Sequence, residues 1–199
     1  MDAGLEKRIE RLEAIETIRQ LASRYALAID VRDPDALMEL FEEDVQVGRD
    51  RFGRAALKEW FDNILRNRIK QTAHIVMNHV IEFESEEAAY GLVYCRAEHE
   101  LDHRFVVQQM QYWDTYVGRA GHWYFRRRIP LAWYATDVLD RPVGEQKVRW
   151  PDQAPREGEL PGWWPSWGEY WQSAPPTTET PLRPSVPPEQ WLARVRRKL

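Results

Sequence analysis

Several residue types and patterns are scarce in this chain, and each absence narrows what it can be. A single cysteine, Cys95, stands among 199 residues, so the sequence offers neither a disulfide framework nor a cysteine metal site. No apolar run approaches the roughly 20 residues of a membrane-spanning helix. The net charge is −4, and the one notable basic run, RVRRK at 194–198, is short. We therefore expect no nucleic-acid partner and no membrane partner.

The opening residues, MDAGLEKRIERLE, are too charged for a signal peptide. With no secretion signal and no disulfide framework, the expected location is cytoplasmic.

Tryptophan and proline are abundant, by contrast, and both gather late in the chain. Six of the ten tryptophans and ten of the thirteen prolines fall within residues 150–199. Proline lacks an N–H donor and cannot continue a regular sheet, whereas so much tryptophan argues against simple disorder. We therefore predict a domain at residues 1–149 and an arm at residues 150–199 that packs on the domain or on a neighbouring subunit. A short terminal helix is predicted after Pro188.

The first 70 residues have helical periodicity. Apolar residues recur every three or four positions over residues 5–29, which predicts an amphipathic helix. Asp33 followed by Pro34 predicts the cap and the first position of a second, short helix. A third helix is predicted over residues 53–69.

From residue 71 the period changes to two, which is typical of strands. Four long strands are predicted, at residues 71–84, 88–102, 105–118 and 122–135. The short turns between them imply antiparallel neighbours. Three helices followed by an antiparallel meander predict an α+β domain.

The first of these strands, QTAHIVMNHVIEF, carries two histidines. Side chains alternate between the faces of a strand, so His74 and Asn78 share one face and His79 lies on the other. The two histidines are therefore expected to look in opposite directions, so that if His74 faces inwards, His79 points at the outer face of the sheet.

The order of elements and two stretches of sequence resemble a known family. IRQLASRYALAIDVRDPDALMELFEEDV (18–45) and MQYWDTYVGRAGHWYFRRR (110–128) are similar to the SnoaL-like branch of the nuclear transport factor two-like superfamily. The resemblance covers about residues 5–135. It implies a cone-shaped α+β barrel, in which a bent antiparallel sheet wraps around the N-terminal helices and encloses a deep apolar pocket. This fold serves dehydratases, isomerases and non-catalytic subunits, so the fold alone does not assign a function.

Within the family, the chain most resembles the dehydratases that use an Asp–His dyad. These include scytalone dehydratase, bile acid 7α-dehydratase and hexachlorocyclohexane dehydrochlorinase. Their Asp closes the first helix and their His opens the first long strand, and Asp30 in YALAID and His74 in QTAHIV match those positions. The resemblance also places a second pocket histidine on His99 and a pocket tyrosine on Tyr25.

Elementary chemistry gives such a pair a use. A carboxylate at a helix C-terminus opposes the helix dipole, so Asp30 is poorly placed as a helix stabiliser. Paired with a histidine, it would fix the ring tautomer and steady the imidazolium once the other nitrogen takes a proton. From the residues alone, Asp30 could equally be a solvated helix-end carboxylate and His74 an ordinary packed strand residue.

The resemblance implies a cofactor-independent lyase, most simply a dehydratase. In this hypothesis His74, paired with Asp30, removes an acidified C–H proton. His99 then protonates the departing hydroxyl, and Tyr25 polarises a carbonyl oxygen.

The predicted substrate is a bulky, apolar, multi-ring or long-chain molecule, contacted by Asn78, Cys95 and Trp60. No metal is expected, because His99 and His103 would lie roughly 13 Å apart on an extended strand.

Three alternatives stay open. An isomerase would use the same residues and return the proton to another carbon. A structural β subunit of a ring-hydroxylating dioxygenase would share the fold and need a large partner chain. A ligand carrier of the same fold would bind a small molecule without chemistry. For the enzyme we expect a homo-oligomer, a dimer or a trimer.

Overall fold

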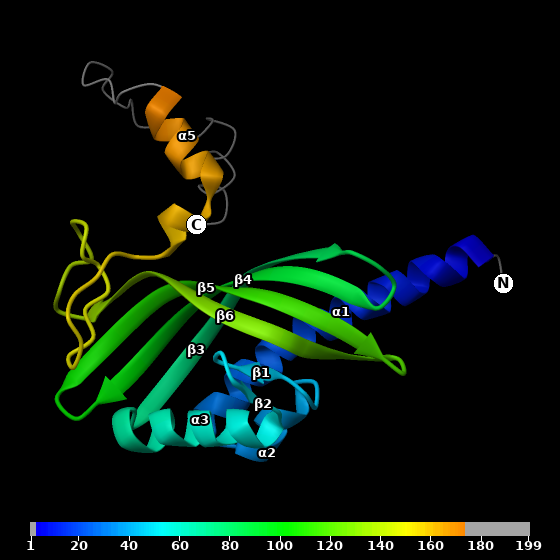
Figure 1. Cartoon of the computed structure of the whole chain (residues 1–199), viewed down its shortest axis with the longest axis horizontal. Coiled ribbons are helices and arrows are strands. Elements are labelled where there is room, and N and C mark those ends of the chain that lie inside the picture. The colour runs from blue at the N-terminus through cyan, green and yellow to red at the C-terminus, as the bar shows by residue number, and fades with distance from the viewer. Residues whose placement is uncertain (1–2, 174–199) are drawn as a thin grey trace, which may run out of the picture. The chain divides into compact units, whose positions relative to one another are not determined.

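The computed structural model describes residues 3–173 (Figure 1). Three helices come first and four long strands follow. The helices are α1 (Ala3–Asp30), α2 (Pro34–Glu39) and α3 (Arg54–Arg68), and the strands are β3 (Gln71–Phe83), β4 (Ala88–Leu101), β5 (Arg104–Arg119) and β6 (His122–Asp137). The minor elements are β1 (Gln46–Val47), β2 (Arg51–Phe52), α4 (Leu160–Trp163) and α5 (Pro165–Ser173). No helix in this part of the chain is long and apolar enough to cross a membrane.

Capping residues set the boundary between α1 and α2. Arg32 has a φ of 60°, its N–H donates to the Ile29 carbonyl, and the Asp33 N–H reaches back to the Ala28 carbonyl. This is a Schellman pattern, which ends a helix in a left-handed residue. Asp33 then caps α2, where its carboxylate accepts a first-turn N–H at 3.0 Å, and Pro34 takes the first helical position as predicted.

The four long strands form one antiparallel sheet in the order β3-β4-β5-β6. The sheet curves over α1, and α2 and α3 lie on the same side of it (Figure 1). Alternate residues of β4, among them Val93, Cys95 and Ala97, face the helices and are completely buried. They pack against an α1 stripe that includes Ile18 and Tyr25. The predicted α+β class, with a curved sheet over N-terminal helices, is confirmed.

A β-bulge in β3 changes which residues face the interior. Val76 pairs with Cys95 and His79 pairs with Val93, so two residues of β3 stand opposite one residue of β4. One extra residue reverses the alternation of side chains beyond it. Strict alternation therefore fails in the middle of this strand.

The bulge corrects two expectations. His79 does not point outwards: it shares the inner face with His74, and its Nε2 lies 3.0 Å from the Tyr116 hydroxyl. Gly91 leaves room for this contact, because a Cβ there would lie 2.6 Å from the Tyr116 ring. Asn78, expected to face inwards, is in the bulge and exposed.

A buried ion pair that was not predicted from the sequence lies in the same region. Arg128 donates to Asp114 through Nε at 2.8 Å and through a terminal nitrogen at 2.6 Å. The two side chains are 4% and 0% exposed. The Tyr116 hydroxyl donates to the same carboxylate at 2.8 Å. The guanidinium also lies 4.1–4.3 Å from the ring centres of Tyr25, Tyr112 and Phe125. Burial alone would lower the pKa of Arg128, but the Asp114 charge outweighs it and the pKa is raised.

The segment after β6, residues 148–163, covers the free edge of that strand. Val148 is completely buried and bridges to Ala135 of β6. The Glu159 carboxylate accepts the Ala132 N–H of the same strand at 2.7 Å. An edge strand left open would present unpaired N–H groups to other chains, so this segment closes the sheet on one side.

The chain divides into two compact units after Trp163. The predicted division falls earlier, after residue 149, because composition changes there. Leu160 is completely buried, and Trp163 makes an edge contact with Trp113 of β5 at 5.4 Å. Residues 150–163 thus pack as part of the first unit. The helix predicted after Pro188 lies outside the described residues, and packing of the arm on a neighbouring subunit stays a prediction.

We predict that ending the chain after Arg149 lowers its melting temperature by about 5–10 °C. The truncation exposes the surface under Leu160 and the edge N–H groups of β6, and one buried leucine alone contributes about 1.5–3 kcal/mol. Thermal unfolding followed by circular dichroism measures the change. A chain ending after Trp163 keeps the contacts of residues 150–163 and should melt at a higher temperature than the chain ending after Arg149. Equal melting of all three proteins would show that residues 150–163 add no stability.

Candidate functional site

Asp30 and His74 lie together where the end of α1 meets β3. His74 Nδ1 is 2.7 Å from one carboxylate oxygen of Asp30, and the His74 backbone N–H donates to the other at 2.8 Å. Because one residue engages both oxygens, the ring and the carboxylate have a fixed relative orientation. The His74 side chain is 6% exposed and that of Asp30 is 25% exposed. The pair is therefore largely withdrawn from water without being sealed.

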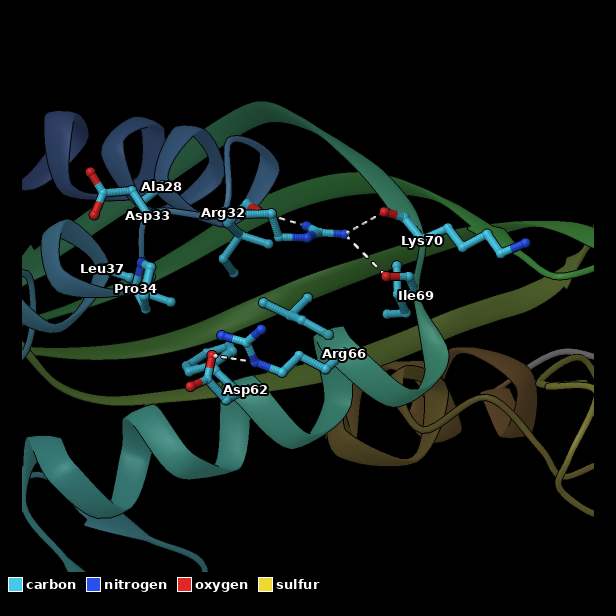
Figure 2. Close-up of a pocket in the computed structure, with 12 residues that line it drawn as sticks. Ala28, Arg32, Asp33, Pro34, Leu37, Asp62, Arg66, Ile69 and Lys70 are labelled. Atoms are coloured by element: carbon cyan, nitrogen blue, oxygen red, sulfur yellow. Dashed lines mark hydrogen bonds and ion pairs between the residues drawn. The ribbon is translucent and has the colours of Figure 1, made fainter.

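Arg32 ties together the two segments that carry this pair. Its guanidinium donates to the carbonyl oxygens of Ile29 at 2.7 Å, of Ile69 at 3.3 Å and of Lys70 at 3.3 Å (Figure 2). Ile29 directly precedes Asp30, and Lys70 directly precedes β3. Arg32 was not among the residues predicted from the sequence. The only hint in the sequence is that an arginine, and not the usual glycine, stands where the first helix ends.

With Nδ1 engaged, Nε2 is the nitrogen of His74 that remains for chemistry. No hydrogen bond joins it to another side chain of residues 3–173. Because the carboxylate accepts the Nδ1 proton, a neutral His74 has an unprotonated Nε2, which is the form that a general base requires. The carboxylate would then stabilise the imidazolium that forms.

His99 lies beside His74 on the inner face of β4, with their ring centres 5.8 Å apart. The Thr72 hydroxyl oxygen is 3.0 Å from His99 Nδ1 and 3.5 Å from His74 Nδ1. His99 is 6% exposed, and its buried Nε2 has no hydrogen-bond partner in the described part of the chain. Burial, aided by the charge of His74 and opposed in part by the Gln108 side chain, lowers the pKa of His99 to about 4.

This pKa argues against the role expected for His99. At pH 7 a group with a pKa near 4 is protonated in only about one molecule in a thousand. His99 is therefore a poor source of the proton for a departing hydroxyl. A neutral imidazole still donates a hydrogen bond through its N–H, so His99 can bind an oxygen without transferring a proton.

Trp150 covers His99 from the segment that follows β6. The two ring centres are 5.4 Å apart, and the rings are inclined at 50°. Two residues later, Asp152 accepts a hydrogen bond of 2.6 Å from Arg68 at the end of α3. Tryptophans of this segment were predicted to pack on the domain, but none was predicted at the candidate site.

Tyr25 lies five residues before Asp30 on α1, and its ring meets the His74 ring edge-on at 6.4 Å. Burial, offset in part by the Arg128 charge, raises the pKa of Tyr25 to about 12. Tyr25 is therefore a neutral phenol that can donate a hydrogen bond. A side-chain hydrogen bond joins it to Tyr112.

A cavity of about 320 Å³ adjoins the pair, between the end of α1, α2 and α3 (Figure 2). Its apolar lining includes Ile29, Leu37, Phe61 and Leu65, and Arg32, Arg66 and Lys70 supply positive charge. Ile29 is the neighbour of Asp30, and the Phe61 ring lies 6.2 Å from that of Tyr25. Asp33 and Asp62 also line the cavity, whereas Asp30, His74, His99 and Tyr25 do not, so it lies next to the candidate site and does not enclose it.

Three predicted contact residues do not line the cavity. Cys95 is completely buried, and burial raises the pKa of its thiol to about 11, so it is an inert core residue. Trp60 is 45% exposed, and its ring packs on Phe61 without lining the cavity. Asn78 lies exposed in the bulge. Within residues 3–173, no group of three or more His, Cys, Asp or Glu side chains could hold a metal ion.

The two buried histidines predict a loss of stability in acid. Burial lowers the pKa of both His79 and His99 to about 4, below the ordinary value of 6.5. Between these values the unfolded chain binds protons that the folded chain does not. Stability is therefore full above about pH 6.5 and falls as the pH drops towards 4. The slope is at most about 1.4 kcal/mol per pH unit for His99 and smaller for the more exposed His79.

Urea unfolding between pH 7 and pH 4 measures this slope. His99→Gln should flatten it, whereas the exposed His103→Gln, as the matched control, should leave it unchanged. Identical slopes in the wild type and both variants would mean that burial of His99 does not govern its protonation.

Comparisons with known proteins give the following. The SnoaL-like domain family matches residues 10–129. No curated protein matches significantly. Among solved structures, a protein from Novosphingobium aromaticivorans DSM 12444, assigned provisionally as a scytalone dehydratase, is 25% identical. That alignment covers 74% of this chain and 99% of the other, with a TM-score of 0.60.

Two further structures show a similar fold. Hexachlorocyclohexane dehydrochlorinase LinA-type3 from Novosphingobium barchaimii LL02 is 20% identical, with a TM-score of 0.61 over 66% of this chain and 94% of the other. A protein from Novosphingobium aromaticivorans, assigned provisionally as an aromatic ring hydroxylase, is 22% identical. That alignment covers 62% of this chain and 92% of the other, with a TM-score of 0.54.

Proposed function

The chain belongs to the SnoaL-like domain family, and from this membership and the geometry of its Asp30–His74 pair we propose that it is a cofactor-independent lyase, a dehydratase. The observation that carries the proposal is the 2.7 Å contact between His74 Nδ1 and the Asp30 carboxylate, which leaves Nε2 as a base. A histidine that only fills space in a strand would not need a carboxylate that it holds by both oxygens.

The proposed reaction is an elimination of water. His74 Nε2 takes a proton from a carbon that is acidified by a neighbouring carbonyl or an activated ring. The electron pair of that C–H bond forms a C=C bond as the adjacent C–O bond breaks. The imidazolium gives its proton to the departing hydroxyl, so water leaves and His74 returns to its starting form.

The neighbouring donors have supporting roles in this scheme. Because the pKa of His99 is lowered to about 4, His74 rather than His99 carries the proton in both directions. Tyr25, a neutral phenol, can donate to a carbonyl oxygen as negative charge develops there. In this scheme His99 and Tyr25 stabilise the developing charge through hydrogen bonds, and neither changes its protonation state.

We propose a bulky, apolar, hydroxylated substrate. The adjoining cavity, at about 320 Å³, falls in the range of small-molecule pockets and has a largely apolar wall. The likeness to a protein assigned provisionally as a scytalone dehydratase supports a hydroxylated ring compound.

Mass spectrometry in D₂O tests the proposal. The protein is incubated with a panel of hydroxylated ring ketones, and a dehydratase should yield a product lighter by one water. His74→Ala should yield none above background. A product of unchanged skeleton mass that has gained deuterium would instead identify an isomerase, which the same residues could serve.

A structural β subunit of a ring-hydroxylating dioxygenase is the second candidate. The likeness to a protein assigned provisionally as an aromatic ring hydroxylase favours it at the level of the fold. Such a subunit would co-purify with a large iron–sulfur partner chain, whereas a dehydratase would purify alone, as a homo-oligomer in our expectation. Gel filtration with protein identification separates the two.

A further inference from the structure

Arg32 has a backbone conformation that residues other than glycine avoid. Its φ is 60°, and among residues 3–173 the other non-glycine residue with a positive φ is Ala120, in the turn between β5 and β6. In this left-handed region a Cβ crowds the backbone, and glycine is the usual residue where a Schellman pattern ends a helix. The backbone thus favours glycine at position 32. An arginine that is kept there at a cost points to a task for its side chain.

The side chain joins the ends of two helices. Ile29 lies in the last turn of α1, and Ile69 and Lys70 directly follow α3. The last carbonyl groups of a helix lack partners within it and carry the negative end of its dipole. One terminal nitrogen of the guanidinium donates to Ile29 at 2.7 Å, and the other donates to both Ile69 and Lys70 at 3.3 Å (Figure 2). Because the guanidinium is planar and rigid, these bonds also fix the distance between the two helix ends.

The two helix ends lead directly into the residues of the candidate site. Asp30 follows Ile29, and β3, with His74, begins after Lys70. In the described part of the chain, the hydrogen bonds between residues 28–33 and residues 69–74 have two sources. One is the Arg32 guanidinium, and the other is the Asp30–His74 pair itself. The pair therefore depends on Arg32 for the other polar connection between its two sides.

We propose that Arg32 is the positioning residue of the Asp30–His74 pair: its guanidinium fixes the end of α1 against the start of β3 and so holds the Asp30 carboxylate on His74 Nδ1. The proposal rests on the proposed function in one respect, since that function gives the pair its use as a base. Without the guanidinium the two segments are free to move apart, and a neutral His74 can hold its proton on either nitrogen. A reacting group displaced by about 1 Å can cost about 100-fold in rate.

The order of the pair can be tested without any substrate. In protein labelled with ¹⁵N-histidine, long-range ¹H–¹⁵N correlation spectra should show the neutral His74 ring protonated on Nδ1. Arg32→Gly and Arg32→Ala should both shift His74 towards a mixture of tautomers. Guanidinium chloride, added to Arg32→Gly far below the concentrations that unfold proteins, should fill the vacated position and restore the Nδ1 form. Sodium chloride at the same concentration should not.

Melting temperatures separate positioning from stability. Arg32→Gly relieves the backbone strain and should melt about 2–4 °C above Arg32→Ala, which keeps a Cβ. Both variants should nevertheless lose the single tautomer of His74 to the same extent. Ala120→Gly is the matched control, because it relieves the same kind of strain in an exposed turn. It should raise the melting temperature of the wild type and leave the His74 spectrum unchanged.

Turnover gives a second readout once the D₂O screen has identified a substrate. Arg32→Gly should lower kcat by about tenfold or more and change KM by less than about twofold, because it disturbs the base and removes no group that binds substrate. Guanidinium chloride should recover part of the lost kcat, whereas sodium chloride should recover none.

Each outcome has a separate meaning. A His74 that stays protonated on Nδ1 in Arg32→Gly would overturn the positioning role, even if the protein proves to be a dehydratase. So would a loss of the single tautomer in Arg32→Ala that the higher-melting Arg32→Gly does not share, since the arginine would then act through stability alone. Tautomer shifts and guanidinium rescue as described, in a protein that dehydrates nothing, would overturn the proposed function and leave the role of Arg32 standing.

Discussion

Replacing His74 with alanine, or Asp30 with asparagine, should lower turnover by about 100-fold or more. General acid–base groups typically contribute 10²–10⁴ to a rate. Alanine removes the base, whereas asparagine keeps the shape of Asp30 but removes the charge that steadies the imidazolium. The measurement is kcat on the first substrate that the D₂O screen identifies.

His103→Ala is the matched control, because His103 is an exposed histidine in the turn that follows β4. It should change turnover less than twofold, a threshold that we set well below the 100-fold effect. His79→Ala is unsuitable as a control, since His79 contacts the Tyr116 hydroxyl in the interior. Both His74 and Asp30 variants should keep the circular dichroism spectrum of the folded protein. A folded His74→Ala protein with undiminished turnover would remove His74 from the mechanism.

Asp114→Asn should destabilise the folded chain by roughly 3–5 kcal/mol, which corresponds to a fall in melting temperature of about 10 °C. The substitution leaves the Arg128 guanidinium, 4% exposed, without its counter-charge. The surrounding rings of Tyr25, Tyr112 and Phe125 attract a cation but do not replace a carboxylate that accepts two hydrogen bonds. Urea unfolding measures the difference.

The paired replacement of Asp114 by Leu and Arg128 by Met is the informative control. Removing both charges leaves no ion buried alone, so the double variant should be more stable than Asp114→Asn. An Asp114→Asn protein within about 1 kcal/mol of the wild type would mean that water reaches the guanidinium. In that case the pair would not be buried in solution.

The helices and strands were predicted well from patterns of neighbouring residues. The spacing of apolar residues in α1, the Asp33–Pro34 cap of α2 and the change to a period of two at residue 71 each depend on neighbours in the sequence, so each could be read from it. The Asp30–His74 pairing was reached through the family resemblance. In the structure Asp30 lies at the end of α1 and His74 near the start of β3, and His74 Nδ1 is 2.7 Å from an oxygen of the Asp30 carboxylate.

Features that depend on distant partners could not be predicted from the sequence in the same way. The bulge in β3 adds one residue relative to β4, and nothing in QTAHIVMNHVIEF marks it, so His79 was placed on the wrong face. Arg32 bonds to backbone carbonyls, which carry no sequence signature. The lowered pKa of His99 depends on burial, to which Trp150 contributes from another part of the chain.

The central claim is that Asp30 and His74 act as one unit in proton transfer, and a double-mutant cycle tests it most directly. Turnover is measured for the wild type, His74→Ala, Asp30→Asn and the double variant under saturating substrate. A coupled pair predicts that the double variant is about as slow as the slower single variant, because either change already disables the unit. Independent residues would instead give losses that multiply: the fold loss of turnover in the double variant would equal the product of the two single losses. That result would contradict the claim.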